Sequence, residues 1–244
     1  MHVSFAIPAH NEQGLLPATL DAVHDAARRL KLEYDIVVAD DASNDNTAQV
    51  ARDHGARVVS IQARQIAAAR NAAARASTGE VLIFVDADTR VTPSAVEEAI
   101  DAMHRGAAGG GAMITFDGPV PWWASVMLAP LVIGFRLFKY TGGCFLFCTR
   151  RAFDAAGGWD ETLFASEEIE MARRLKKLGR FVIVKSTVIT SGRKLRTYTG
   201  GEVFRAFLRM GLSPRTAVKS RDKLGLWYDP RREDPLSSDA PGRA

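Results

Sequence analysis

The chain of 244 residues has 47% hydrophobic residues, 25% charged residues and a net charge of +4. This balance is typical of a globular protein and excludes a disordered chain or a disulfide scaffold. The length suits a single domain with a tail. Cys144 and Cys148 have no His or further Cys at metal-ligand spacing, so they predict buried thiols in a reducing compartment and no zinc site. No signal-peptide pattern follows Met1, and we therefore expect a cytoplasmic protein that begins near this residue.

The first third of the chain alternates short β-branched runs with helical patterns. Strands are expected at 3–8, 34–39, 57–61 and 81–85, and helices at 15–32, 47–54 and 66–76. Such alternation predicts an α/β fold, in which helices flank a mostly parallel central sheet. Four strands with intervening helices form a Rossmann-like half.

The pattern changes after the fourth strand. Helices are expected at 93–105 and 166–178, and strands at 112–116 and 180–184. Gly109-Gly110-Gly111 is expected to break the chain before one of these strands. Residues 122–135 carry no charge and are interrupted by Pro130, a run too short to span a bilayer. From Asp229 onward, the composition predicts disorder.

Acidic or polar clusters follow three of the expected strands: Asn11-Glu12, Asp40-Asp41 and Asp86-Ala87-Asp88. Open parallel sheets bind ligands at the carboxyl ends of their strands, so the clusters are expected to meet at one edge. Each cluster alone could consist of turn formers or helix caps. Asp86 and Asp88 flank a small residue, and such carboxylates suit Mg²⁺ or Mn²⁺ bound together with substrate phosphates.

Five motifs in order resemble those of the family 2 glycosyltransferases. They are Ile7-Pro8-Ala9-His10-Asn11-Glu12, Asp40-Asp41-Ala42-Ser43 with Asp45 and Thr47, Ala69-Arg70-Asn71-Ala72-Ala73, Asp86-Ala87-Asp88, and Gly157-Gly158-Trp159-Asp160-Glu161 with Glu167-Glu168. The resemblance covers about residues 3 to 200 and implies the GT-A fold. It also implies a UDP- or GDP-linked sugar donor, a divalent metal and inversion at the anomeric carbon. The implied domain covers 1–228, with a nucleotide-binding half at about 1–90, an acceptor-side half at about 91–228 and a disordered tail at 229–244.

The resemblance also implies roles for individual residues. Those expected along the nucleotide sugar are Pro8, Ala9, Asn11, Glu12, Asp40, Asp41, Arg64, Arg70, Asp86, Ala87 and Arg193. Asp88, with Asp86, is expected to bind the metal. Asp41 would accept a hydrogen bond from the base, whereas Arg64 and Arg70 would approach the diphosphate or lie on a helix surface.

The acid/base role falls on the Glu167-Glu168 pair. In the family an acidic residue at the start of this helix removes the proton of the acceptor hydroxyl, and Glu168 matches its position. Alternatively, both glutamates only complement the helix dipole. Many members also supply a late His to the metal, whereas 188–194 of this chain contains none. Arg193, Lys194 and Arg196 could compensate by holding the diphosphate, or they could form a solvent-facing basic loop.

Other classes of function fit the sequence less well. A nucleotidyltransferase would usually show a Gly-rich loop near its start, and a dinucleotide-dependent oxidoreductase would show G-x-G-x-x-G, but 7–12 contains no glycine. A non-catalytic nucleotide-sugar-binding subunit stays an alternative. The segment from Lys185 to Lys223 contains ten Lys or Arg residues and only two acidic residues. This excess of positive charge predicts an anionic partner. No nucleic-acid motif occurs there, so a diphosphate or a membrane surface is favoured.

The interval 122–139 raises a further expectation about the acceptor. Trp122 and Trp123 with the apolar run behind them would suit a glycan or lipid-linked acceptor at the inner face of a membrane, where Arg136 and Lys139 meet anionic lipid. The segment could equally be a buried helix or a dimer contact. The sequence does not set the oligomeric state.

Overall fold

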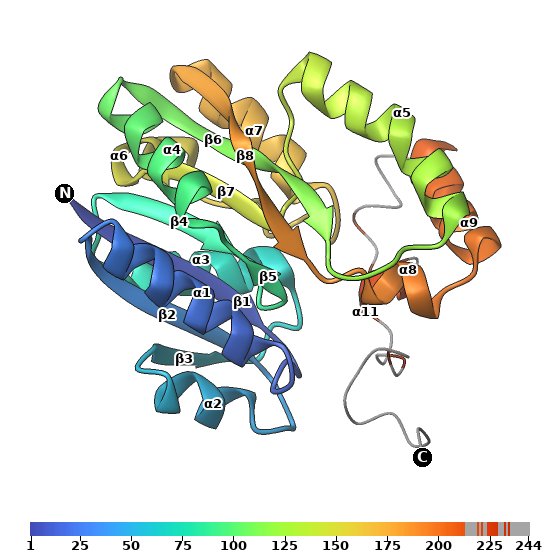
Figure 1. Ribbon diagram of the computed structural model, residues 1–244, viewed down its shortest axis with the longest axis horizontal. Coiled ribbons are helices and arrows are strands. Elements are labelled where there is room, and N and C mark those ends of the chain that lie inside the picture. Colours follow the sequence, from blue (N-terminus) through green and yellow to red (C-terminus); the bar gives the residue numbers. More distant parts are fainter. Residues whose placement is uncertain (213–218, 220, 222–223, 229–231, 233, 235–244) are drawn as a thin grey trace.

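A single mixed sheet organises the chain, with its strands in the order β3-β2-β1-β4-β7-β6-β8-β5 (Figure 1). The computed structural model describes residues 1–212, 219, 221, 224–228, 232 and 234. The strands are β1 His2–Ala9, β2 Glu33–Asp41, β3 Arg57–Ile61, β4 Val81–Val85, β5 Thr89–Arg90, β6 Ala107–Phe116, β7 Phe145–Thr149 and β8 Arg180–Thr190. The helices are α1 Leu16–Arg29, α2 Thr47–Asp53, α3 Ile66–Ala76, α4 Pro93–His104, α5 Trp122–Phe138, α6 Arg150–Ala156, α7 Glu167–Leu178, α8 Arg193–Thr197, α9 Gly200–Leu212 and α11 Gly225–Tyr228.

The first four strands form the parallel half of the sheet. Strand β1 pairs in parallel with both β2 and β4, and β3 joins β2. Helices connect these strands, as the alternating pattern predicts, and the bounds of α3 and β4 match the expected ranges. The predicted Rossmann-like half is confirmed, and it brings the carboxyl ends of β1, β2 and β4 to one edge.

Alternation along the strands divides the core into two layers. On β1, Val3, Phe5 and Ile7 pack into one cluster with α1 and α4, whereas Ala6 points into the other. The second cluster contains α3, α6 and α7, together with Trp159. Since neighbouring side chains of a strand point to opposite faces, helices cover both sides of the sheet.

Strands of the second half run in mixed directions. Strand β7 is antiparallel to both β4 and β6, while β8 pairs in parallel with β6. The expected chain break at Gly109-Gly110-Gly111 is wrong, because the three glycines lie inside β6. A Cβ on Gly110 would overlap the carbonyl of Val182 and the ring of Phe147. Glycine is therefore used here for close packing and not for a turn.

Helix α5 continues through Pro130 to Phe138 and lies at one end of the molecule beside α9 (Figure 1). Among the described residues, no helix is both long enough and apolar enough to cross a bilayer. Most of the tail expected to be disordered, at 229–231, 233 and 235–244, lies outside the described residues. Arg232 and Asp234 are described, and both form ion pairs with the body of the protein.

Candidate active site

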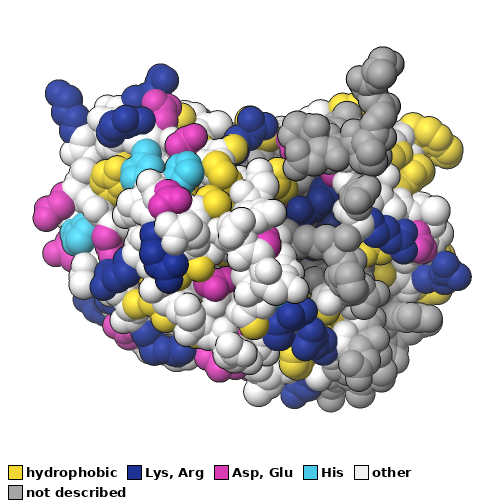
Figure 2. All heavy atoms as spheres, turned by 90° about the horizontal axis from the view of Figure 1, so that it is seen from below, with side chains coloured by type: hydrophobic (Ala, Val, Ile, Leu, Met, Phe, Trp, Pro, Cys, Tyr) yellow, Lys and Arg dark blue, Asp and Glu magenta, His cyan; other side chains and the backbone are white. Residues whose placement is uncertain are grey.

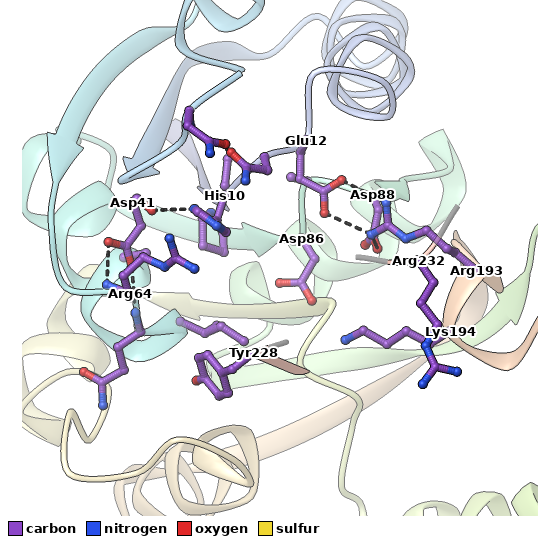
Figure 3. A pocket seen from close by; sticks show the side chains of 18 of the residues that line it. His10, Glu12, Asp41, Arg64, Asp86, Asp88, Arg193, Lys194, Tyr228 and Arg232 are labelled. Carbon is purple, nitrogen blue, oxygen red and sulfur yellow. Dashed lines mark hydrogen bonds and ion pairs between the residues drawn. The ribbon is translucent and has the colours of Figure 1, made fainter. Parts of the chain in front are cut away.

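A cavity of about 540 Å³ opens at the carboxyl ends of β1, β2 and β4. Ten of the residues expected along the donor or metal line it: Pro8, Ala9, Asn11, Glu12, Asp41, Arg64, Asp86, Ala87, Asp88 and Arg193. Figure 3 shows Asp41 and Arg64 at one end of the cavity, Asp88 with Arg193 and Lys194 at the other, and Asp86 between them. The three acidic clusters therefore meet, as the parallel sheet predicts.

Two loops that form one wall of the cavity hold each other through hydrogen bonds. The Asn11 side chain accepts a hydrogen bond from the Asn44 backbone amide at 2.9 Å, and the Asn11 backbone amide donates to Ser43 Oγ at 2.9 Å. The amide of Glu12 donates to Thr47 Oγ1 at 2.7 Å. Asn11 has a φ of 51°, a left-handed conformation that Asn tolerates better than most residues. These contacts give the motif residues a structural role besides any contact with a nucleotide.

Asp41 and Asp40 lie on opposite faces of β2. The Asp41 carboxylate lines the cavity and accepts hydrogen bonds from the amides of Arg64 and Gln65, both at 2.7 Å. Asp40 does not line the cavity, and its buried Oδ1 has no hydrogen-bond partner within the described part of the chain. The expected place of Asp40 beside the base is therefore not seen, because the alternation of the strand turns its side chain away.

Arg193 forms an ion-pair bridge at the cationic end of the cavity. Its Nη2 lies 3.2 Å from Glu12 Oε1 and 3.5 Å from Asp88 Oδ2. Burial, together with the charges of Glu12 and Asp86, raises the pKa of Asp88 to about 6, although Lys194 and Arg193 oppose the shift. The carboxylates thus crowd one another, and a cation beside them relieves the repulsion.

The donor set at this position suits a hard divalent cation with few protein ligands. Asp86 and Asp88 offer carboxylate oxygens, which Mg²⁺ and Mn²⁺ prefer. Within the described residues, no group of three His, Cys, Asp or Glu side chains could hold a metal ion by itself. Substrate phosphates would have to complete the coordination, and the cation would share the acidic site with the guanidinium of Arg193.

Arg70 is buried below the cavity and does not line it. Its Nη2 donates to Asp86 Oδ1 at 2.8 Å and its Nη1 to Glu167 Oε1 at 2.7 Å. The guanidinium also lies over the ring of Trp159, 4.5 Å from the centroid. The expected approach of Arg70 to the diphosphate is therefore not seen. Instead, Arg70 links a donor-side carboxylate to the first turn of α7.

Asn71 links α3 to the sequence motif that contains Trp159 and Glu161. Its Nδ2 donates to the carbonyl of Trp159 at 2.9 Å and to Glu161 Oε1 at 2.7 Å, and its Oδ1 accepts from the Trp159 amide. Gly157 and Gly158 in that loop have φ values of 79° and 74°, which favour glycine. The loop before α7 is thus fixed against α3, and this contact positions the glutamates that follow.

Glu167 and Glu168 occupy different environments although they are adjacent. The Glu167 side chain is buried and bound by Arg70. Burial, followed by repulsion from Glu167, raises the pKa of Glu168, and the charge of Asp86 acts in the same direction. Glu168 therefore has the higher proton affinity that a general base uses, and it lies within electrostatic reach of the donor side.

Sequence reasoning missed several residues of the cavity. Tyr228 and Arg232 line it from the C-terminal part of the chain, and Tyr198 lines it from the end of α8. Arg232 lies over the Tyr198 ring at 4.0 Å and forms an ion pair with Glu202. These residues do not recur at the spacing of a helix or a strand. Their basic and aromatic side chains are the sequence feature that could have indicated a binding role.

Replacement of Arg70 by Lys is expected to lower the free energy of unfolding by about 1–3 kcal/mol. Lysine cannot reproduce the planar fork between Asp86 and Glu167 or the stacking on Trp159. Arg75→Lys on the same helix is the matched control, since its side chain is 66% exposed. Urea unfolding of both variants provides the measurement, and equal midpoints would contradict the central role of Arg70.

A mixed sheet of this order, with an acidic cavity at the ends of its parallel strands, is the arrangement of the GT-A fold, as the resemblance predicted. The family model described as glycosyl transferase family 2 matches residues 4–156. The chain therefore belongs to glycosyl transferase family 2.

Curated relatives and solved structures agree with this assignment. An undecaprenyl-phosphate 4-deoxy-4-formamido-L-arabinose transferase from Pseudomonas fluorescens is 34% identical over 106 residues, covering 41% of this chain and 31% of the relative. The chain thus matches about a third of the length of that relative.

Two solved structures have a similar fold. A mannosyltransferase from Pyrobaculum calidifontis, solved with GDP-Man and Mn²⁺, has a TM-score of 0.66 at 20% identity, covering 86% of this chain and 61% of the other. Glucosyl-3-phosphoglycerate synthase from Mycobacterium tuberculosis, solved with Mn²⁺, UDP and glucosyl-3-phosphoglycerate, has a TM-score of 0.54 at 21% identity, covering 90% and 81%. At 20% and 21% identity, these two similarities show the fold of this chain and no more.

Proposed function

We propose that the protein transfers a sugar from a UDP- or GDP-linked donor to an acceptor hydroxyl. The observation that carries the proposal is that Asp41, Asp86 and Asp88 line the same cavity as the cations Arg193 and Lys194. Asp41 at one end suits the base, and the cations Arg193 and Lys194 beside Asp88 at the other end suit a diphosphate. The neighbours solved with GDP-Man or with UDP support the choice of donor.

The transfer step is a single displacement. Glu168 takes the proton of the acceptor hydroxyl, whose oxygen forms a bond to the anomeric carbon. The bond from that carbon to the phosphate oxygen breaks, and the nucleoside diphosphate leaves with the electron pair. Attack from the face opposite the leaving group inverts the anomeric carbon. Arg70 fixes Glu167 and thereby the start of the helix that presents Glu168.

Asp88 and Asp86 are the residues that would hold a divalent cation, which supplies Lewis-acid stabilisation of the departing diphosphate when bound. Arg193 lies beside the same carboxylates and would add a second positive charge near the phosphates. The resident Mn²⁺ of the two fold neighbours supports this assignment.

The acceptor hydroxyl is proposed to belong to a lipid-linked molecule. The printed names of the curated relatives, which are undecaprenyl-phosphate transferases, support this class. The cytoplasmic location expected from the sequence remains a prediction.

A panel of nucleotide sugars tests the proposed activity. The purified protein is incubated with each donor and Mn²⁺, and release of nucleoside diphosphate is measured with and without excess chelator. We expect metal-dependent release with one donor, since water can replace the acceptor slowly. Binding without turnover in the presence of polyprenyl phosphates would instead favour a non-catalytic nucleotide-sugar-binding subunit. The absence of both binding and release across the panel would contradict the proposal.

A further inference from the structure

Helix α5 exposes an apolar stripe that no described part of the chain covers. Trp122, Val126, Ile133 and Leu137 are 79%, 68%, 58% and 73% exposed. Their spacings of four, seven and four residues place them on one side of the helix. At 1.5 Å per residue the stripe is roughly 22 Å long. Ordinary protein surfaces carry single, scattered apolar side chains, so a continuous stripe of this length is unusual.

Helix α9 adds a second exposed apolar strip. It begins against α5, because a Cβ on Gly200 would lie 3.1 Å from Trp123 Cδ2. Val203 is buried, whereas Phe204 and Leu208, one turn apart, are exposed. The two helices lie side by side in Figure 1, and Figure 2 shows hydrophobic side chains gathered at the same end of the molecule. We refer to this surface as the α5–α9 face.

Cations border the α5–α9 face at the end of α5. Lys139 is exposed directly after the helix. From α7, Lys176 donates to the carbonyl of Phe138 at 2.7 Å, and Arg173 donates to Tyr140 Oη at 3.3 Å. Lys177 is exposed on the same helix. These contacts attach the cationic part of α7 to the end of the apolar stripe.

Among the residues that the structure describes, acidic groups near the face are few and paired. No Asp or Glu occurs between Asp117 and Asp154 in the sequence, so α5 carries none. Glu170 on α7 lies 3.8 Å from Arg173, and Glu202 on α9 pairs with Arg232. Arg205 is exposed beside Phe204. The border of the face is therefore cationic.

We propose that the α5–α9 face docks on the surface of an anionic lipid bilayer. Apolar side chains enter the boundary between headgroups and acyl chains, while the bordering Lys and Arg contact anionic headgroups. Trp122 lies at one end of the stripe, and tryptophan favours this boundary. A second copy of the chain is the weaker occupant, since a two-fold interface would bring the cationic borders together. The inference goes beyond the proposed transfer, because docking requires neither donor nor acceptor.

Vesicle flotation tests the docking. The full chain is mixed with vesicles of phosphatidylcholine alone or of phosphatidylcholine with phosphatidylglycerol, without nucleotide sugar. We expect flotation with the anionic vesicles only, and its loss at high salt. The double variant Val126→Ser/Ile133→Ser is expected to reduce partitioning at least tenfold, since two exposed apolar side chains leave the boundary. Lys139→Glu/Lys177→Glu is expected to reduce it roughly fivefold for each cation removed.

Arg29→Glu, which makes the same kind of charge change on α1, is the matched control and is expected to float like the wild type. Circular dichroism confirms that each variant is folded. Should a variant fail to fold, quenching of wild-type tryptophan fluorescence by brominated lipid tests the docking instead, and Trp122→Phe is expected to lose part of the quenching.

The proposal is overturned if the wild type stays in solution with anionic vesicles, if it floats equally with phosphatidylcholine, or if the stripe variants float normally. Concentration-dependent dimers that Val126→Ser/Ile133→Ser dissociates, without vesicle binding, would make the face a contact between copies. Because no donor is present, failure of docking leaves the proposed transfer intact, and failure of transfer leaves docking intact.

Discussion

Replacement of Glu168 by Gln is expected to lower the rate of transfer by about 10²–10⁴-fold while donor binding is retained. The amide keeps the shape of the side chain but cannot take the proton of the acceptor hydroxyl. In the wild type, kcat/KM should rise with pH through a pKa well above that of an ordinary glutamate, because burial and Glu167 raise the pKa of Glu168. The residual rate of the variant should lose this dependence. Steady-state kinetics across the pH range measure both effects.

The same variant is expected to be more stable than the wild type at high pH. The Glu168 carboxyl binds its proton more tightly in the folded protein than in the unfolded chain. Between the two pKa values the folded state therefore holds more protons, and its stability falls as the pH rises through this range. Glutamine removes that loss. Thermal unfolding in chelator should show a higher Tm for Glu168→Gln above the folded pKa and little difference near pH 4, below both values.

Glu167→Gln is the matched control for Glu168→Gln. Glu167 binds the buried guanidinium of Arg70, so its loss of charge should reduce stability by about 1–3 kcal/mol. Its effect on the chemical step should be smaller. If Glu167→Gln lost more activity than Glu168→Gln, the base would be Glu167. Unchanged rates in both variants would return the pair to helix capping.

Asp88→Asn is expected to lower kcat/KM by about 10²-fold or more and to weaken binding of Mn²⁺ in the presence of nucleoside diphosphate. Removal of a metal-binding charge costs several kcal/mol of transition-state stabilisation. The fold should persist, because Arg193 keeps its ion pair with Glu12. Since the pKa of Asp88 is raised to about 6, its carboxylate is unfavourable in the metal-free fold at neutral pH. The metal-free variant should therefore unfold at the same temperature as the wild type or at a higher one.

The control for Asp88→Asn is Asp101→Asn, because Asp101 is an exposed residue of α4. Its kinetics and metal binding are expected to match the wild type. Excess chelator should reduce wild-type transfer to the level of Asp88→Asn. Full turnover by Asp88→Asn, or by the wild type in chelator, would remove the metal from the proposed mechanism.

The local sequence pattern alone predicts the strands and helices of the parallel half of the fold. Strand β4 and helix α3 match the predicted bounds because a short apolar β-branched run and an Ala-rich segment each end at a clear change of composition. Placement of Asp41, Asp86 and Asp88 at one edge followed from the rule that parallel strands end on the same side. The glycines of β6 were misread, since a glycine chosen for close packing and a glycine chosen for a turn look alike in sequence.

The sequence by itself determined the class of fold and the acidic edge of the sheet, and it predicted the role of the Glu167-Glu168 pair. Only the tertiary structure decided that Arg70 is buried outside the cavity lining, that Arg70 binds Glu167 and Asp86, and that Asp40 turns away. It also brought Arg193 to Glu12, a residue 181 positions away in the sequence. Short-range pattern records the period of an element and the turn that ends it. The partners of a buried charge depend on how distant elements pack, and no local pattern contains that information.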